Sequence, residues 1–331
     1  MLTPFVLLII LIALVFDFLN GFHDAANSIA TIVSTRVLTP RKAVVWAAFF
    51  NFAAAFLFGE SVAATVGKGL VKLELINEYV ILCGLLGAIF WDIITWYFGL
   101  PTSSSHALMG GYAGAAIAKA GFGSILYGGW TNTLIFMVVA PIMGMVIGFT
   151  IKVTLMWMFH HRPSSKINHA FRRLQLLSAA ALSLGHGAND SQKTMGVITG
   201  LLVTAGVLKT FVVPFEVLIL CYVSIALGTL FGGWRIVKTM GQKVTKLKTS
   251  DGFAAEGAGA VTLLMTAISG IAVSTTHTIT GAIMGVGATK RLSAVRWGIA
   301  GRIVMAWILT IPLSAIVSAL LYWLLSPFFS H

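Results

Sequence analysis

Long apolar segments separated by short polar ones run through most of this chain. Five apolar segments precede a basic central stretch and five follow it, at residues 4–31, 42–59, 79–99, 103–118 and 130–151, and then 172–206, 214–232, 253–273, 277–289 and 297–325. A helix needs about 20 apolar residues to cross a bilayer. The pattern therefore predicts an all-α polytopic membrane protein with about ten spans.

Two kinds of segment do not fit a straight crossing. Segments 4–31 and 172–206 are too long, and each contains an Asp inside a polar motif, so we expect both to be broken helices or pairs of segments, which would raise the count to twelve. Segments 103–118 and 277–289 are short and begin with Ser and Thr. These two are expected to be half-helices or re-entrant hairpins, which membranes tolerate where protein covers the backbone.

The composition excludes a soluble domain. The chain has 331 residues, of which 58% are hydrophobic and only 10% charged. The apolar runs lack the short alternation of an outer-membrane barrel. Cys83 and Cys221 each lie within an apolar run, so no disulfide framework is indicated.

The formal net charge of +12 is concentrated in a few loops. If the spans alternate, four basic loops fall on one side; they contain Arg36, Arg41 and Lys42; Lys152, Arg162, Lys166, Arg172 and Arg173; Arg235, Lys238, Lys243, Lys246 and Lys248; and Lys290, Arg291 and Arg296. On the other side, four lysines are nearly balanced by four glutamates. The positive-inside rule then places the central loop in the cytoplasm and both termini outside. This distribution orients a membrane protein and indicates no nucleic-acid partner.

Four landmarks recur in the two halves in the same order. GFHDAANS at Gly21 matches GANDSQKT at Gly187, and PTSSSHALMGG at Pro101 matches AVSTTHTITGA at Ala272. A weaker pair is TVGKGL at Thr65 with TMGQKV at Thr239, and Pro141 pairs with Pro312. The offsets lie between 166 and 174 positions. We therefore predict a first repeat over 1–151, a short basic cytoplasmic linker over 152–171, and a second repeat over 172–331.

With about five spans in each half, the second repeat enters the membrane from the opposite side. The expected fold is thus an inverted-topology repeat of about 5+5 spans, 10–12 in total. In transporters built this way, the substrate site lies near the midplane, at broken helices of the two repeats.

The Ser/Thr stretches have the chemistry of an anion site. Ser103, Ser104 and Ser105 open one apolar helix, and Ser274, Thr275 and Thr276 open the matching one. Hydroxyls and free N–H groups at a helix N-terminus bind anions. Ordinary N-capping is the alternative explanation for Ser and Thr at these positions. Two such termini facing each other could surround a tetrahedral oxyanion.

The Asp motifs need a different explanation, because a carboxylate repels an anion unless a cation or proton intervenes. Asp24 and Asp190 are suited to hold a coupling ion, or to accept a hydrogen bond from a protonated oxyanion. Hydrogen phosphate has such a P–OH donor and sulfate has none. The neighbouring polar groups are His23, Asn27, Asn189, Gln192 and Lys193, of which Lys193 stands where the first repeat has Asn27.

Metal-dependent catalysis is disfavoured. His23, His106, His186 and His277 could be read as ligands, but no HExxH or similar spacing is present. The chain is therefore predicted not to be an enzyme, and no cofactor is expected. Proton handling by one or more of these histidines is the better interpretation.

The stretches GFHDAANSIATIVSTR, YFGLPTSSSH, GHGANDSQKTMG and VSTTHT closely resemble the signatures of the inorganic phosphate transporter (Pit) family. The resemblance covers about residues 16 to 325. It implies secondary active uptake of phosphate by symport with H⁺ or Na⁺, through alternating access in an inverted-repeat fold. It also implies that the matching polar positions form the site. Phosphate would bind at Asn27, Ser103, Ser104, Ser105, Gln192, Lys193, Ser274, Thr275 and Thr276. A proton or coupling ion would bind at His23, Asp24, Asn189 and Asp190, and any Na⁺ at Asp24, Asn27, Asn189 and Asp190.

Two departures from the family pattern refine this expectation. His23 stands where many members have Asn, as in proton-coupled bacterial members, which favours H⁺ over Na⁺. The long hydrophilic central domain of many members is only a short basic loop here, which indicates a compact form in a prokaryotic plasma membrane. A separate cytoplasmic protein would then be the regulatory partner. The small-residue pairs GGYAG and GAIMG predict close helix packing, and small-residue faces would also permit a homodimer. The alternatives are a sulfate or other oxyanion symporter of the same fold, an anion channel, and a membrane metal-dependent phosphatase.

Overall fold

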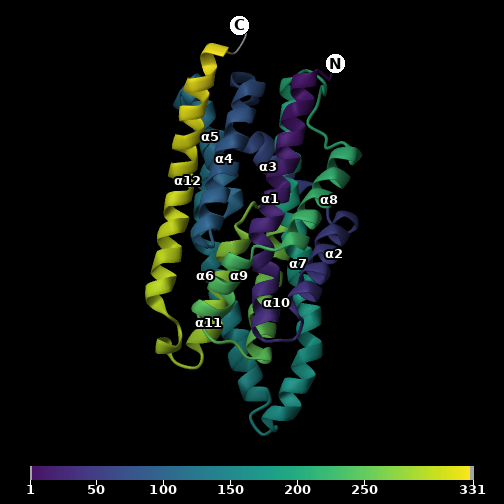
Figure 1. Ribbon diagram of the computed structural model, residues 1–331, viewed down its shortest axis with the longest axis vertical. Coiled ribbons are helices and arrows are strands. Elements are labelled where there is room, and N and C mark those ends of the chain that lie inside the picture. The colour runs from purple at the N-terminus through teal and green to yellow at the C-terminus, as the bar shows by residue number, and fades with distance from the viewer. Residues whose placement is uncertain (1, 329–331) are drawn as a thin grey trace.

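The computed structural model describes residues 2–328, which form a bundle of helices (Figure 1). The α-helices are α1 (Pro4–Ser34), α2 (Pro40–Ala53), α3 (Ser61–Gly69), α4 (Glu78–Phe98), α5 (Ser104–Ala120), α6 (Tyr127–Met158), α7 (Ser164–Thr204), α8 (Phe215–Phe231), α9 (Trp234–Lys238), α10 (Thr249–Ile268), α11 (Thr275–Ala288) and α12 (Trp297–Leu325). Short 3₁₀ or π turns follow α2, α3, α5, α9, α11 and α12. The expected all-helical class is confirmed.

The ends of the chain lie at one end of the bundle, and the turn between α6 and α7 lies at the other (Figure 1). Among the described residues, α1, α4, α6 and α12 are each long and apolar enough to cross a membrane. The pairs α2 with α3 and α8 with α9 pass the same test only together, with bends of 85° and 60°. The predicted spans at 42–59 and 214–232 therefore continue into a second, angled segment.

The prediction that the Asp motifs interrupt their helices is wrong. Helix α1 is continuous over 31 residues and α7 over 41. Nothing in the motifs removes a backbone donor, and their glycines serve packing instead. A Cβ on Gly21 would lie 2.1 Å from the Ile225 carbonyl oxygen of α8, and one on Gly187 would lie 2.4 Å from the Asn51 carbonyl oxygen of α2. Each Asp motif thus holds its helix against the broken helix of the other repeat.

The breaks occur where the chain has the means to leave a helix. After α8, Gly232 adopts φ = 67°, a left-handed conformation that suits glycine. After α2, a 3₁₀ turn at Ala54–Phe56 ends the helix before Gly59. The stretch 152–171, expected to be a linker, is mostly helical, because α6 runs to Met158 and α7 begins at Ser164.

The predicted short spans are the second arms of two helical hairpins, α4–α5 and α10–α11. The segments that flank the two ends of each hairpin are hydrogen-bonded to each other, so both ends of a hairpin lie on the same side of its tip. Lys72 N–H donates to the Ser124 carbonyl at 2.9 Å, and Arg296 N–H donates to the Val244 carbonyl at 3.0 Å. The first hairpin opens toward the end that bears the termini and the second toward the α6–α7 turn (Figure 1).

Matching hydrogen bonds hold the two hairpin tips against the angled segments of the opposite repeat. The Thr65 hydroxyl donates to the Gly270 carbonyl at 2.7 Å, and the Thr239 hydroxyl donates to the Gly99 carbonyl at 3.0 Å. Thr65 and Thr239 are the first residues of the weakest repeat pair in the sequence. The threonine that the two copies share thus holds a hairpin tip by one hydrogen bond, and we call each of these two bonds a latch.

The small-residue faces of α5 and α11 are used inside the chain. A Cβ on Gly281 would lie 2.2 Å from the Pro141 carbonyl oxygen of α6, and one on Gly114 would lie 2.1 Å from the Ala315 carbonyl oxygen of α12. These contacts confirm close helix packing. The GGYAG and GAIMG faces are therefore not free to form a homodimer.

We expect Gly281→Ala to destabilise the protein by about 1–3 kcal/mol, because the added methyl group meets rigid backbone of α6. Gly301→Ala on the outer face of α12 is the matched control, since nothing lies within 4 Å of its Cβ position. Thermal unfolding of both variants in detergent measures the difference. Equal melting temperatures for the two variants would contradict the close approach of α6 and α11.

Candidate functional site

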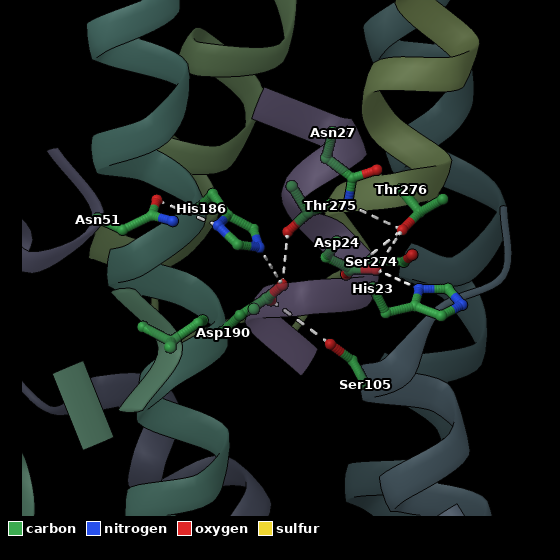
Figure 2. Close-up of polar contacts among 12 residues, drawn as sticks. His23, Asp24, Asn27, Asn51, Ser105, His186, Asp190, Ser274, Thr275 and Thr276 are labelled. Carbon is green, nitrogen blue, oxygen red and sulfur yellow. Dashed lines mark hydrogen bonds and ion pairs between the residues drawn. The ribbon is translucent and has the colours of Figure 1, made fainter. Parts of the chain in front are cut away.

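The two Asp residues of the repeated motif lie together in the centre of the bundle. Asp24 on α1 and Asp190 on α7 are 2% and 0% exposed. One carboxylate oxygen of each and one ring nitrogen of His186 lie within 4.8 Å of one another. Figure 2 shows these side chains converging between α1, α7 and the two hairpin tips.

Around Asp24, the contacts come from both repeats. His23 Nδ1 lies 2.8 Å from the Asp24 carboxylate, and its Nε2 lies 3.2 Å from the Thr95 hydroxyl of α4. The Thr276 hydroxyl of α11 lies 3.4 Å from both carboxylate oxygens. The Asn27 amide donates to the same hydroxyl at 2.9 Å. Asp24 is thus held by its neighbour and by the hairpin of the other repeat.

Asp190 has the complementary arrangement. Its carboxylate pairs with Lys193 one turn later in α7 and lies 3.2 Å from His186 Nε2 one turn earlier. The Ser105 hydroxyl of α5 donates to it at 3.4 Å and the Thr275 hydroxyl at 3.1 Å. Lys193 Nζ also donates to the Ser105 hydroxyl at 2.6 Å. A fully buried ion pair is thereby joined to both hairpin tips.

The hydroxyls of the two Ser/Thr stretches divide into two sets. Ser103 and Ser274 are N-caps, and each accepts a hydrogen bond at 3.2 Å from the backbone N–H of the following His, which is His106 in α5 and His277 in α11. Ser105 and Thr276, at matching positions, instead reach the Asp of the opposite repeat. N-capping therefore accounts for the first hydroxyl of each stretch and not for the third.

Two of the expected site residues lie differently from the rest. The Gln192 carbonyl oxygen accepts a hydrogen bond at 2.9 Å from Val62 N–H, in the first turn of α3. Asn189 is fully buried, and neither its amide nitrogen nor its carbonyl oxygen has a partner among the described residues.

Several buried polar atoms of the motif-bearing helices have no partner among the described residues. Buried donors and acceptors are nearly always paired, so these atoms are candidates for contact with a polar ligand. Within the described part of the chain these atoms include Asn27 Oδ1, Ser28 Oγ, Ser104 Oγ, Asn189 Oδ1 and Nδ2, and Ser191 Oγ. They come from α1, α5 and α7, the helices that carry the motifs.

Several residues of the site lie outside the predicted set of binding positions. His186, one of the four histidines considered above for proton handling, lies at i−4 from Asp190, a spacing that places both on one helix face. Its Nδ1 lies 3.1 Å from Asn51 Oδ1 of α2. Asp92 of α4 lines a cavity of about 120 Å³ together with His23. Nothing in the local sequence marks Asn51, Thr95 or Asp92, since they join the site from α2 and α4, outside the repeated motifs.

The fixed charges of the site come from carboxylates and one lysine. Asp190 pairs with Lys193, Asp24 and Asp92 add negative charge, and His23 and His186 add positive charge only when protonated. An arriving anion increases the negative charge in a buried place, where an uncompensated charge is costly. The converging atoms of Asp24, His186 and Asp190 supply a place where a cation or shared protons could balance it.

Comparison with known proteins gives one consistent result. A family model described as "Phosphate transporter family" matches residues 20–167 and again 159–318. The chain is 55% identical over 321 residues to a "Probable low-affinity inorganic phosphate transporter" of Rhizobium meliloti, covering 97% of this chain and 96% of that protein. It is 43% identical to the protein of the same description from Bacillus subtilis, with 98% of each covered. A solved structure described as "The sodium-dependent phosphate transporter" matches with a TM-score of 0.90 at 27% identity, over 99% of this chain and 100% of that one.

Proposed function

The chain belongs to the phosphate transporter family, and from that premise we propose that it imports inorganic phosphate by symport with a cation, with H⁺ as the driving ion. It is a multi-pass membrane protein and a transporter, not an enzyme. The observation that carries the proposal is the crossed arrangement of the site, in which each hairpin tip contacts the Asp of the opposite repeat.

Phosphate fits this arrangement better than other oxyanions. Two helix N-termini with hydroxyls offer donors to the phosphate oxygens, and Lys193 offers a positive charge. Asp24 and Asp190 accept from a P–OH group, for which sulfate has no equivalent. Asn27, Asn189 and Ser104 supply the unpartnered polar atoms that would complete the binding site.

The arrangement of the helices supports alternating access. We assign three crossings and one re-entrant hairpin to each repeat, in place of the five crossings expected for each half. In this assignment α4 belongs to a hairpin although it is long enough to cross, and α7 is a crossing because of its 41 residues. A hairpin and a pair of crossings both return the chain to the side it left, so the inverted topology is unchanged. The site residues are 0–2% exposed, so one hairpin tip must leave its latch before phosphate can enter or leave. Release of the Thr65–Gly270 latch would open one side of the site, and release of the Thr239–Gly99 latch the other.

Contacts among the basic loops support the proposed orientation. Arg172 donates to the Arg36 carbonyl at 2.9 Å, which joins the start of α7 to the first basic loop. Lys290 Nζ donates to the Lys246 carbonyl at 2.8 Å, which joins the two others. These loops gather at one end, which we assign to the cytoplasm of a prokaryotic cell.

The driving ion decides the charge balance of each transport cycle. His23 bridges Asp24 and Thr95, whereas the matching position in the second repeat is Asn189, which does not titrate. A proton held between His23 and Asp24 would offset one negative charge of phosphate. Na⁺ at Asp24 and Asp190, with Asn27 and Asn189 nearby, is the competing assignment, and the structural neighbour of 27% identity is described as sodium-dependent.

We expect phosphate to accumulate in proteoliposomes under an inward proton gradient without sodium. An inward Na⁺ gradient at equal pH should drive no accumulation, and excess sulfate should not compete. Accumulation under the Na⁺ gradient alone would replace H⁺ by Na⁺ as the driving ion. Flux that never exceeds equilibrium under either gradient would indicate a channel and would refute symport.

A further inference from the structure

A basic pocket lies far from the site, at the turn that joins the two repeats. It has a volume of about 300 Å³, and its lining residues come from the end of α6, the turn that follows, the start of α7 and the start of α10. Its polar lining consists of Lys152, His160, Arg162 and Ser250. We propose that this pocket binds the phosphate headgroup of an anionic phospholipid.

Free donors of Arg162, Lys152 and Ser250 line the same pocket. Arg162 has no side-chain partner among the described residues, so all the N–H donors of its guanidinium remain available. Lys152 Nζ donates to the Ser250 hydroxyl at 2.8 Å and pairs with Asp251 at 2.7 Å, which leaves its third donor. Ser250 accepts from Lys152 and keeps its own hydroxyl proton. These are the groups that bind phosphate oxygens through charge-assisted hydrogen bonds.

The pocket carries a net positive charge. Asp251, beside the pocket, forms ion pairs with two lysines, Lys152 at 2.7 Å and Lys290 at 2.6 Å. No acidic residue is among the described residues that line the pocket. Because Arg162 has no counter-charge, the pocket keeps a net positive charge and attracts an anion rather than a cation.

Apolar side chains distinguish this pocket from a site for a free anion. Leu155, Phe159, Ile167 and Phe171 line it beside the cations. The rings of Phe159 and Phe171 meet edge to face with centroids 5.8 Å apart, and Phe171 is 2% exposed. Free phosphate gains nothing from such a wall, whereas the glycerol and first acyl carbons of a lipid can pack against it.

The depth of the pocket also suits a headgroup. Helix α6 has 32 residues and is about 48 Å long, whereas the hydrocarbon core of a bilayer is about 30 Å thick. The last turns of α6 therefore extend past the hydrocarbon, and Lys152 to Arg162 reach the level of the lipid phosphates. A basic pocket at that level meets anionic lipid at high local concentration.

The pocket is connected to the moving parts of the protein through Asp251. This side chain is 0% exposed and ties Lys152 of α6 to the first turn of α10, the helix that leads to the Ser274 tip. A headgroup bound to Lys152 and Ser250 would hold the base of the α10–α11 hairpin against α6. Bound lipid is thus placed to stabilise one position of that hairpin.

The test is lipid binding by the purified full chain, measured by native mass spectrometry with added phosphatidylglycerol. We expect Arg162→Gln to weaken binding of the tightest lipid about tenfold, as loss of a charge-assisted contact predicts. Arg291→Gln is the matched control, because Arg291 is exposed at the same end and lies outside the pocket. It should leave that affinity unchanged.

Two further binding measurements identify the ligand. Diacylglycerol with the same acyl chains should not bind at this site, and sodium phosphate should not displace phosphatidylglycerol. Displacement by sodium phosphate would replace the lipid by a free anion and overturn the proposal. Equal lipid affinity of the Arg162→Gln and Arg291→Gln variants would do the same. Both outcomes are independent of transport, so they leave the proposed symport untouched.

Discussion

Asp24→Asn is expected to reduce phosphate uptake at least about 100-fold while the protein remains folded in the membrane. The substitution keeps the shape of the side chain but removes the negative charge that accepts from His23 and Thr276. Loss of a charge-assisted interaction worth about 2.7 kcal/mol corresponds to that factor. The carboxylate is also the group proposed to hold the proton or cation that accompanies phosphate, so the coupled cycle should fail outright.

Initial uptake rates in proteoliposomes measure the effect, with Glu216→Gln as the control. Glu216 lies on the exposed first turn of α8, and the same acid-to-amide change there should leave uptake within about twofold, as surface substitutions usually do. A folded Asp24→Asn protein that transports at the normal rate would show that Asp24 has no part in coupling.

Asp190→Asn is expected to destabilise the protein by about 3–5 kcal/mol, in contrast to Asp24→Asn. Lys193 is 1% exposed, and Asp190 is the acidic group paired with it. Removal of the carboxylate leaves the ammonium group with two neutral partners, the Ser105 hydroxyl and the Val273 carbonyl. Breaking a buried ion pair from one side carries this cost because the remaining charge is uncompensated. Asp24 has no lysine partner, and neutral His23 can stay beside an amide.

The double variant Asp190→Asn with Lys193→Met separates stability from transport. An apolar side chain in place of the lysine removes the unpaired charge, so most of the lost stability should return, as with other buried pairs replaced together. The double variant should not transport phosphate, because the proposed anion and cation sites are both altered. Thermal unfolding in detergent and uptake in proteoliposomes give the two readouts. A double variant no more stable than Asp190→Asn would show that the cost does not come from an unpaired Lys193.

The hairpins show how far the hydropathy pattern reaches. It identified the long apolar segments but not the short angled helices α3 and α9. It also could not tell two short crossings from one re-entrant hairpin, because both consist of paired apolar helices joined by a polar turn. The hydropathy pattern also led to the wrong prediction that the helices break at the Asp motifs. The breaks lie instead between α2 and α3 and between α8 and α9, where Gly232 and the turn at Ala54–Phe56 end the helices. Polar side chains do not break a helix, because they leave its backbone hydrogen bonds intact.

The sequence alone determined the membrane class, the internal repeat and the positions of the motifs, since these depend on composition and order along the chain. Only the tertiary structure decided which motif meets which. Ser105 reaches Asp190 across 85 positions, and Thr276 reaches Asp24 across 252. It also brought His186 and Asn51 to the site and turned the glycines of the motifs into helix contacts. These outcomes depend on how the two repeats interlock, and local patterns of residues carry no record of contacts between distant helices.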